Sequence, residues 1–414
     1  MSADIPMQKP TVLIAGAGPV GMYAALALAQ KGAAVRIVDP GLWPCAHSYA
    51  LALHPASIAL LSRSGISLDD AYLVDTIRLC DAGGERAALK LPQPLAVLRQ
   101  SVLESRLETA LRNAGLAIEW NREVAIAVHD ADHVTVTLEP RESTDVEFVL
   151  GADGHSSRVR QSTGIEFPEV APAQYYAVFE FKSDFNTNNA MRVVLGNGTS
   201  DLLWPLPGGC CRWSFQLPEY SDIEAEQYKD RLLAYGLGHV PTARLKDRAS
   251  DSPQPGSLDG SYLRALIAER APWFNGSIEN LSWGAVVRFE RRLAHAFGRG
   301  RIWLAGDAAH LASPGGVQSM NSGLVEAAEL AALFASNAVP PAFENYNSRW
   351  VSTWRQLQGV DGGLHATSRT DPWIASNAGR LAACLPAYGD DLVALAAQLE
   401  LEAAAFETAA SGPR

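Results

Sequence analysis

The chain has 414 residues, which is more than a single hydrophobic core usually serves. Of these residues, 48% are hydrophobic and 19% are charged. These proportions exclude a disordered, collagenous or coiled-coil protein. Its 34 lysines and arginines against 45 aspartates and glutamates give a net charge of −11, and no basic cluster occurs, so the chain is not expected to bind nucleic acid.

The five cysteines offer neither an even disulfide set nor the spacing of a metal site. Two of them are adjacent, which is poor geometry for a bridge. We therefore expect free thiols, no bound metal and a cytoplasmic location. The first ten residues lack a signal-peptide pattern, and no run of about 18 apolar residues suggests a membrane-spanning helix. The cysteines are Cys45, Cys80, Cys210, Cys211 and Cys384.

The first elements predicted along the chain form a βαβ unit. Thr11–Ala15 is a wholly apolar run, which is typical of a strand buried on both faces. A helix rich in alanine and leucine is expected over residues 22–31 and ends at Gly32. A second apolar strand over residues 34–38 completes the unit.

The turn inside this unit carries the motif GxGxxG at Gly16, Gly18 and Gly21, and Asp39 ends the second strand. Glycines allow a tight turn and let a pyrophosphate approach backbone N–H groups, while the following helix N-terminus favours negative charge. The carboxylate can bind a ribose hydroxyl. This context predicts dinucleotide binding, but it does not separate NAD from FAD.

Further strands and helices are predicted beyond this unit. Helices are expected over residues 57–64 and 104–114, and buried strands over residues 146–152 and 302–305. Each of these two strands is followed by a turn that contains glycine and aspartate.

The middle of the chain has a different pattern. Apolar and polar residues alternate over residues 175–182 and 211–217, which indicates antiparallel strands with one apolar face. Residues 240–262 are rich in Pro, Ser, Asp and Gly and predict a loop that could act as a mobile lid. From residue 317 onward the chain reads as mostly helical, and residues 381–410 favour a docking or dimer helix.

Two more motifs follow the later buried strands. Counting the glycine motif as the first, the second motif is GADGHSSRVR over residues 151–160, and the third is GDAAH over residues 306–310, followed by SPGGVQSMNSG over residues 313–323. With the glycine motif, in this order and spacing, they resemble the class A flavoprotein monooxygenases, the para-hydroxybenzoate hydroxylase-like group. Arg99 and Gln100 also match that family's pattern, and the resemblance extends to about Trp350.

The resemblance implies an α/β fold: a Rossmann-like FAD-binding domain, a mixed β-sheet substrate-binding domain and a helical C-terminal segment. The expected ranges are 1–74, 96–165 and 285–360 for FAD, 75–95 and 166–284 for substrate, and 361–414 for the C-terminal segment.

The resemblance also implies which residues meet FAD. Physical reasoning agrees at the third motif, where Asp307 can face ribityl or ribose hydroxyls. A helix starting near Gln318 would direct its positive dipole end at an anionic flavin. The family places the Met320 and Asn321 backbone there and the Pro314 carbonyl beside the flavin C4a. The implied FAD-binding residues are Gly16, Gly18, Gly21, Asp39, Arg99, Gln100, Asp153, Arg160, Asp307, Gly315, Gly316, Met320 and Asn321.

The implied reaction is the hydroxylation or epoxidation of an aromatic or polyketide-like molecule. NADPH or NADH would reduce FAD transiently, and O₂ would add to it as a C4a-hydroperoxide. His54 is a candidate base toward a phenolic substrate, as is His47, whereas His310 is expected mainly to pack or cap its turn. Four aromatic residues either line the substrate cavity or form the sheet's own core. They are Tyr175, Phe179, Trp204 and Trp213.

The sequence departs from the family pattern at several positions. Val317 and Ser319 stand where the family commonly has glycine, Tyr49 where it often has arginine, and Asp39 where glutamate is more usual. A flavin-dependent reductase, a halogenase and a flavin-bound redox sensor without turnover remain as alternatives. No WxWxIP signature of tryptophan halogenases is present. A monomer or a homodimer is expected, with no nucleic-acid or membrane partner.

Overall fold

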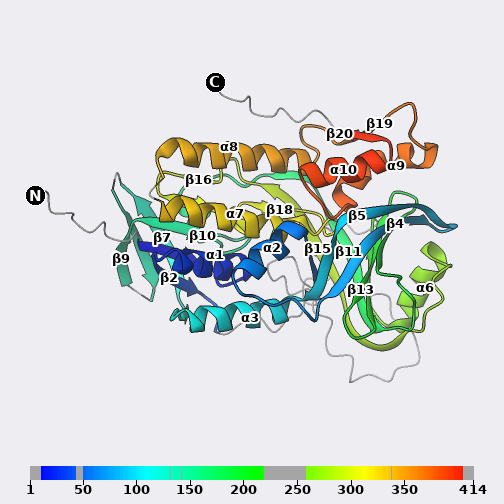
Figure 1. Ribbon diagram of the computed structural model, residues 1–414, viewed down its shortest axis with the longest axis horizontal. Coiled ribbons are helices and arrows are strands. Elements are labelled where there is room, and N and C mark those ends of the chain that lie inside the picture. The colour runs from blue at the N-terminus through cyan, green and yellow to red at the C-terminus, as the bar shows by residue number, and fades with distance from the viewer. Residues whose placement is uncertain are drawn as a thin grey trace, which may run out of the picture.

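The computed structural model describes residues 11–42, 50–130, 132–140, 142–218, 258–336 and 338–403, without the side chains of Ala50 and Leu51. Cys45, His47 and Tyr49 lie outside the described residues, as does the predicted lid up to residue 257. In Figure 1 a sheet with its helices lies on the left, a larger sheet lies on the right, and the C-terminal elements lie above the larger sheet.

A six-stranded sheet in the order β16-β17-β10-β1-β2-β6 forms the left half of the molecule. All its neighbours pair in parallel except β16 and β17. The predicted βαβ unit and the later buried strands all lie in this sheet. The bounds are β1 Thr11–Ala15, β2 Ala34–Asp39, β6 Ile118–Trp120, β10 Phe148–Gly151, β16 Gly298–Arg299 and β17 Ile302–Leu304.

Helices pack beside this sheet (Figure 1), and α1 contacts both α3 and α7. The first helix begins at Pro19, three residues before the predicted start, because the fixed φ of proline suits a first helical turn. The bounds are α1 Pro19–Gln30, α2 Pro55–Arg63, α3 Gln100–Asn113, α4 Arg158–Ser162, α7 Gln318–Ala335 and α8 Pro340–Leu357. A small sheet joins β7 Glu123–His129, β8 Val134–Glu139 and β9 Glu142–Val146.

A nine-stranded mixed sheet in the order β18-β15-β11-β14-β13-β12-β4-β5-β3 forms the other half. Its neighbours pair antiparallel except β12 and β4, so the sheet is mixed, as the sequence resemblance implies. The bounds are β3 Ala50–Leu53, β4 Tyr72–Asp81, β5 Gly84–Arg99, β11 Glu169–Lys182, β12 Ala190–Leu195, β13 Ser200–Leu206, β14 Cys210–Gln216, β15 Glu279–Leu293 and β18 His310–Leu311.

Both faces of this sheet are buried at its centre, so the prediction of one apolar face is wrong. On one face, Phe179 and Trp213 pack with residues of α6 (Gly260–Arg270). On the opposite face, Tyr176 and Val178 form a second apolar cluster with β15. The apparently polar positions of β11 are covered because this second face is directed at the rest of the molecule.

The C-terminal elements are α9 Pro372–Cys384, α10 Asp390–Gln398 and two short paired strands, β19 Leu364–Ala366 and β20 Leu401–Ala403. The tail read as one helix from residue 381 is therefore divided at residues 385–389, where Gly389 has a φ of +59°. The predicted domain limits at residues 74, 95 and 284 fall inside β4, β5 and β15.

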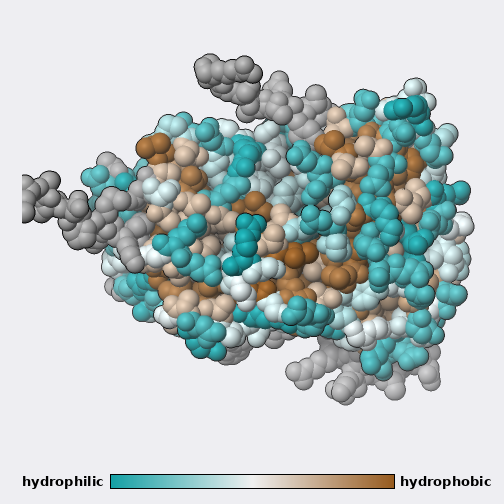
Figure 2. Space-filling view, viewed as in Figure 1, coloured by the Kyte–Doolittle hydropathy of each residue, from teal (hydrophilic) through white to brown (hydrophobic). Residues whose placement is uncertain are grey.

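On the face shown in Figure 2, hydrophobic residues gather near the centre of the molecule, where α2 lies in Figure 1. An open groove beside α2 is lined by Ile58, Ile66 and Leu73, among others. It shares no lining residue with the cavity described below. None of the described helices combines the length and apolar character needed to cross a membrane.

Candidate active site

The glycine loop between β1 and α1 is shaped by close backbone packing on one side and open space on the other. A Cβ atom on Gly16, whose φ is +101°, would lie 2.1 Å from the carbonyl oxygen of Ala152. One on Gly21 would lie 2.0 Å from the carbonyl oxygen of Gly16. Gly18 instead has nothing within 4 Å of its Cβ position and caps α1 without a side-chain hydrogen bond. The loop therefore leaves room for an anion at the helix N-terminus.

Asp39, at the end of β2, holds the glycine loop in place. Its Oδ2 accepts a hydrogen bond from the backbone N–H of Ala17 at 2.7 Å, and its Oδ1 accepts one from Gly41 at 2.7 Å. Each carboxylate oxygen has a second lone pair, so these two bonds still allow a ligand hydroxyl to donate to Asp39.

Asp153 follows β10 and belongs to the second motif. Its Oδ2 accepts from the backbone N–H of Val159 at 3.1 Å, whereas its Oδ1 is buried and has no hydrogen-bond partner in the described part of the chain. Burial raises the pKa of this carboxyl group. Gly16 and Asp153 together line a small cavity of about 150 Å³ between β2 and α4. An unsatisfied buried oxygen there calls for a ligand that donates a hydrogen bond.

Arg160 ties the second motif to the third. Its guanidinium donates to the carbonyl oxygens of Ala308 at 2.7 Å and His155 at 2.6 Å, and it stacks 3.9 Å from the ring centre of Phe167. Burial lowers its pKa to about 10. It does not line the large cavity, so its contacts make it a support for the Asp307 turn.

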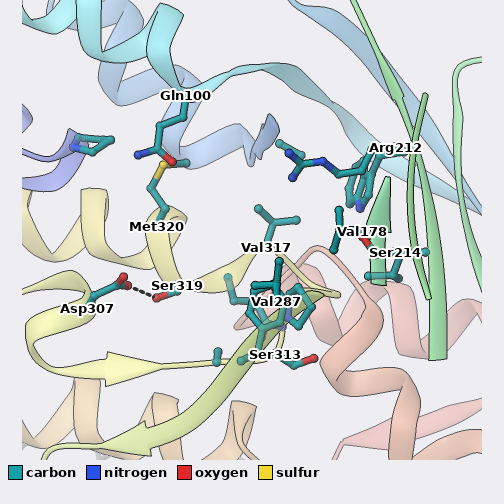
Figure 3. Close-up of a pocket in the computed structure, with 18 of the residues that line it drawn as sticks. Gln100, Val178, Arg212, Ser214, Val287, Asp307, Ser313, Val317, Ser319 and Met320 are labelled. Carbon is teal, nitrogen blue, oxygen red and sulfur yellow. Dashed lines mark hydrogen bonds between the residues drawn. The ribbon is translucent and has the colours of Figure 1, made fainter. Parts of the chain in front are cut away.

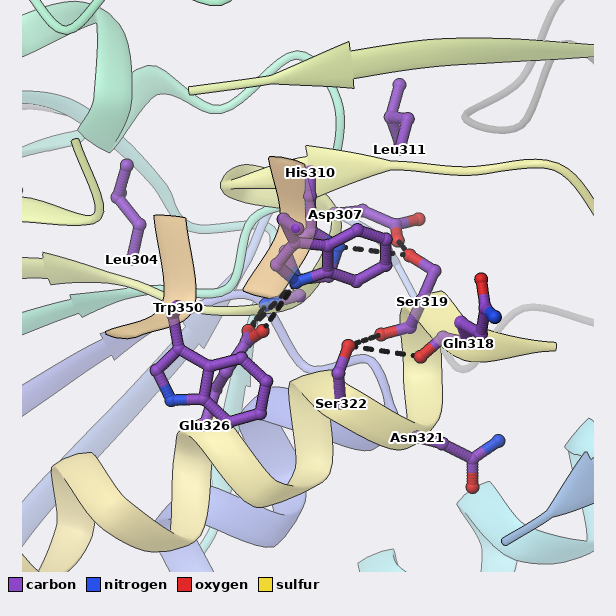
Figure 4. Close-up of polar contacts among 12 residues, drawn as sticks. Leu304, Asp307, His310, Leu311, Gln318, Ser319, Asn321, Ser322, Glu326 and Trp350 are labelled. Atoms are coloured by element: carbon purple, nitrogen blue, oxygen red, sulfur yellow. Dashed lines mark hydrogen bonds and ion pairs between the residues drawn. The ribbon is translucent and has the colours of Figure 1, made fainter. Parts of the chain in front are cut away.

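Asp307 lies in a short 3-10 helix, η2 (Gly306–Ala308), and lines the large cavity. Its Oδ1 accepts a hydrogen bond from the Ser319 hydroxyl at 2.7 Å (Figures 3 and 4). Burial raises the pKa of Asp307, while the hydrogen bond from Ser319 acts in the opposite direction.

His310 is fully buried beneath this turn. Its Nε2 lies 2.9 Å and 3.0 Å from the two carboxylate oxygens of Glu326, and its ring stacks on Trp354 at 3.8 Å between centres. Glu326 also accepts from the Gly306 N–H at 2.9 Å and from the Trp354 indole at 3.1 Å. These contacts hold the Gly306–Ala308 turn, as expected of a packing histidine (Figure 4).

The turn at Gly315 and Gly316 packs against the C-terminal segment. A Cβ on Gly315 would lie 2.7 Å from the carbonyl oxygen of Ala383, and one on Gly316 would lie 2.6 Å from that of Leu385. Gln318 strengthens the same contact, since its amide donates to the carbonyl oxygens of Ala382, Leu385 and Ala387. These glycines thus admit the C-terminal backbone, a constraint that their assignment as FAD-binding residues from the sequence did not include.

His54 lies behind this turn and outside the cavity lining. Its Nε2 donates to the carbonyl oxygen of Gly316 at 3.1 Å, and its backbone N–H donates to Oδ1 of Asn321 at 2.7 Å. The side-chain amide of Asn321 in turn donates to the backbone carbonyl oxygens of Ala52 at 2.8 Å and Val317 at 2.7 Å. Burial lowers the pKa of His54 to about 4. These contacts favour a structural role for His54, in which it holds the turn at Gly316 in place, over a role in proton transfer.

Gln100 and Arg99 lie where β5 meets α3. Gln100 lines the cavity and donates to Glu104 at 2.7 Å. Arg99 lies 3.4 Å from Oε2 of Glu180, a buried carboxylate on β11. Arg212 donates to Oε1 of the same carboxylate at 2.9 Å through its Nε. The predicted arginine thus ends one strand of the large sheet and lies next to a carboxylate of another strand, β11.

The large cavity, so named in contrast to the small one beside Asp153, measures about 350 Å³ and lies between the two halves of the molecule. One wall comes from the glycine loop, Gln100, Asp307 and the start of α7. The opposite wall comes from the large sheet (Figure 3). Its main side chains are Val178, Leu202, Trp204, Leu206, Arg212, Ser214, Trp283, Val287 and Phe289.

Of the four aromatic residues considered from the sequence, Trp204 lines this cavity, whereas Tyr175, Phe179 and Trp213 belong to the core on the other face of the sheet. Sequence reasoning missed the aromatic residues of β15, Trp283 and Phe289. The signal was available, because apolar residues alternate from 283 to 289 in the period of a strand.

A sequence profile of the family described as "FAD binding domain" matches residues 9–226 and 267–347. The chain is 30% identical over 342 residues to 6-methylpretetramide 4-monooxygenase of Streptomyces rimosus, covering 78% of this chain and 55% of that protein. This chain belongs to the FAD-binding class A flavoprotein monooxygenase family.

Other family members give a consistent comparison. Pentachlorophenol 4-monooxygenase of Sphingobium chlorophenolicum is 24% identical over 386 residues, covering 86% of this chain and 64% of that protein. The crystal structure of p-nitrophenol 4-monooxygenase from Pseudomonas putida has the same fold, with a TM-score of 0.64 at 20% identity over 95% of this chain and 94% of that one. The chain spans 55% to 65% of the length of the first three curated relatives that it matches.

The site residues of this chain fit FAD. Gly18 faces open space at a helix N-terminus, which suits a pyrophosphate. Oδ1 of Asp153, which has no hydrogen-bond partner among the described residues, suits a donating hydroxyl group. The Asp307 carboxylate, in the cavity wall, suits the hydroxyl groups of a ribityl chain.

Proposed function

We propose that the chain is an FAD-dependent monooxygenase that uses NADPH or NADH to insert one oxygen atom of O₂ into an aromatic small molecule. The reaction consumes NAD(P)H, a proton, O₂ and the substrate, and it yields NAD(P)⁺, water and the oxygenated product. The observation that carries the proposal is the cavity of about 350 Å³, which has cofactor-type residues on one wall and an aromatic sheet on the other.

Different residues are proposed to hold the two halves of FAD. Gly16, Gly18, Gly21, Asp39 and Asp153 would hold the adenosine and pyrophosphate half, because their loops supply N–H groups and carboxylates.

Gln100, Asp307, Gly315, Met320 and Asn321 would hold or support the flavin half, where the first turn of α7 directs its N–H groups. Bound FAD supplies the electron transfer and the activation of oxygen. The protein contributes orientation, a favourable field and exclusion of water.

The substrate side favours a flat molecule with a polar edge. Trp204, Trp283 and Phe289 offer aromatic contact, while Arg212 adds a guanidinium and Ser214 a hydroxyl group. Arg212 lies 5.3 Å from the ring centre of Trp283, so an acidic or hydroxylated ring could stack and hydrogen-bond together. Pro314 is also a lining residue, and its carbonyl is proposed to lie beside the reacting position.

The finer parts of the proposal concern reductant, assembly and location. The second motif, around Asp153, is proposed to serve NAD(P)H as well as FAD. We propose a monomer or homodimer in the cytoplasm, which agrees with the free thiols of Cys80, Cys210, Cys211 and Cys384. A division into FAD-binding, substrate-binding and C-terminal parts is retained, with the substrate part including all of β4 and β5.

The test is to load the purified chain with FAD, add NADPH or NADH without oxygen, and then admit ¹⁸O₂ in the presence of phenolic and quinonoid compounds. We expect the flavin absorbance to bleach, and one ¹⁸O atom to appear in a product by mass spectrometry. Flavin that bleaches while every compound stays unchanged would favour a reductase or halogenase. Bound flavin that both NADPH and NADH leave oxidised would favour a sensor, and the absence of flavin binding would refute the proposal.

A further inference from the structure

Val317 occupies a backbone conformation that is unfavourable for its residue type. Its φ of +48° and ψ of +36° place it in the left-handed region, which β-branched residues rarely enter. It is also the N-cap of α7, where it supplies no side-chain hydrogen bond, whereas serine, threonine, aspartate or asparagine would. Two local preferences are therefore broken at one residue, which is a pattern found at functional sites.

The Val317 side chain lies in the cavity between its two walls. In Figure 3 it points into the open space, with Asp307 and Met320 on one side and Arg212 and Val178 on the other. Its backbone is fixed from behind, because the Val317 N–H donates to Pro314 at 3.3 Å and its carbonyl accepts from Asn321 at 2.7 Å. The isopropyl group therefore cannot leave the cavity unless this turn rearranges.

We propose that Val317 is a specificity-determining residue that sets the width of the passage between the cofactor wall and the substrate sheet. It would admit single-ring aromatic ligands and hinder the placement of broader fused rings. The inference rests on the proposed function for the identity of the ligand, but the steric role concerns only the cavity. The strain at Val317 is then maintained because the side chain is needed where it lies.

Three substitutions separate bulk from strain. Val317→Ala removes most of the bulk and keeps the strain, since alanine also disfavours a positive φ. Val317→Asn keeps a side chain of similar size and relieves the strain, because asparagine tolerates this conformation and caps helices. Val317→Gly removes both. Binding is measured by quenching of tryptophan fluorescence, which Trp204 and Trp283 in the lining should report with or without FAD.

The probes are 4-nitrophenol with one ring and 1,8-dihydroxyanthraquinone with three. Val317→Ala and Val317→Gly should improve the binding of the three-ring probe relative to the one-ring probe by about tenfold or more. Val317→Asn should keep the wild-type ratio. Its melting temperature should rise by roughly 2 °C, whereas that of Val317→Ala should not rise.

The outcomes distinguish this inference from the proposed function. If the alanine and glycine variants keep the wild-type binding ratio, Val317 does not set the width, whatever the enzyme does. If the ratio changes as expected but ¹⁸O never enters a product, the proposed function fails and the steric role stands. If neither probe binds any of the four proteins, the steric role assigned to Val317 is wrong, and the ¹⁸O experiment alone decides the proposed function.

Discussion

The Ser319 hydroxyl donates a 2.7 Å hydrogen bond to Oδ1 of Asp307, and it lies 3.4 Å from Nδ1 of His310. Two residues of the GDAAH motif are thus joined by a side chain that family members with glycine at this position lack. His310 is in turn paired with Glu326, and both are buried. The Asp307 carboxylate at the cavity wall is therefore connected, through Ser319, to the buried pair of His310 and Glu326.

Ser319→Ala should weaken FAD binding by about tenfold, since a hydrogen bond to a charged group contributes about 1.5 kcal/mol or more. The loss would come from a carboxylate that is less well oriented and more readily protonated. Titration of flavin fluorescence would measure the dissociation constant.

The matched control is Ser322→Ala, whose hydroxyl donates to Gln318 at 3.0 Å and to Ser319 at 3.1 Å, both backbone carbonyls of the same helix. This variant should bind FAD as the wild type does. Equal dissociation constants for both variants would show that the bond to Asp307 has no part in holding the cofactor.

Asp307→Asn should stabilise the flavin-free protein at pH 7 by about 1 kcal/mol, the size of a typical single-site effect. Burial raises the folded-state pKa of Asp307, so the folded chain binds its proton more readily than the unfolded chain. Stability is therefore lost as the pH rises from the ordinary carboxyl pKa of 3.8 to this raised pKa, and the full cost is present above it. Urea unfolding across the pH range would measure the difference.

The gap between Asp307→Asn and wild type should close as the pH falls from the raised pKa of Asp307 to the ordinary value of 3.8, below which the carboxyl group is neutral in both the folded and the unfolded chain. Other buried carboxyl groups are common to both proteins and cancel in the comparison. The same variant should lose FAD affinity at pH 7. A stability gap that widens toward acid would contradict the assigned sign.

His54→Gln should reduce the loss of stability in mild acid. Burial lowers the pKa of His54 to about 4, so the unfolded chain binds a proton between about pH 6.5 and 4 and the folded chain does not. The stability present above this window falls within it, by roughly 3 kcal/mol at most. Glutamine keeps an N–H donor for Gly316 but does not titrate.

Thermal unfolding at pH 7 and pH 5 would check this expectation. The control is His133→Gln, the same substitution at a side chain that is 42% exposed and lies 3.1 Å from Asp130. A change in acid sensitivity that is confined to His54→Gln would support the assignment to His54. An unchanged acid sensitivity in His54→Gln would assign that sensitivity to other groups.

Gly316→Ala should destabilise the protein by about 1–3 kcal/mol, the usual cost of an added methyl group that has no space. The new Cβ would lie 2.6 Å from the backbone oxygen of Leu385, which cannot rotate away as a side chain could. Urea unfolding would report the loss, together with looser packing of residues 382–387 in hydrogen exchange.

Gly379→Ala is the control within the same C-terminal segment. Gly379 lies inside α9 and has nothing within 4 Å of its Cβ position, so alanine should stabilise the helix by about 0.5–1 kcal/mol. If both variants lose the same stability, the close contact between Gly316 and Leu385 is not the cause.

The parts of the fold that depend on local sequence were predictable. The strand Thr11–Ala15 was assigned with the bounds observed, and the start of α7 near Gln318 was too, because apolar runs and turns carry that information. The two buried faces of β11 were not predicted. An alternating pattern does not show that the second face is also covered, since this face lies across the cavity from the glycine loop and the start of α7, each more than 100 residues away in the sequence.

The candidate site shows the same division. Motif positions indicated which loops converge, but not what each side chain contacts. Arg160 and His54 contact backbone carbonyls, not the cavity, and the close approach of residues 383–385 to the glycine turn joins segments about 70 residues apart. Contacts between residues so far apart in the sequence cannot be predicted from the spacing of residues within one motif.

That approach also has a consequence for biosynthesis. The turn at Gly315 and Gly316 and the amide of Gln318 receive their backbone partners from residues 382–387, which are translated after both sheets are complete. A growing chain can therefore fold its sheets before the turn at Gly315 and Gly316, beside the cavity, has gained its contacts with residues 382–387. Tight retention of flavin would be a late event in the maturation of this protein, timed by the emergence of its C-terminal helices.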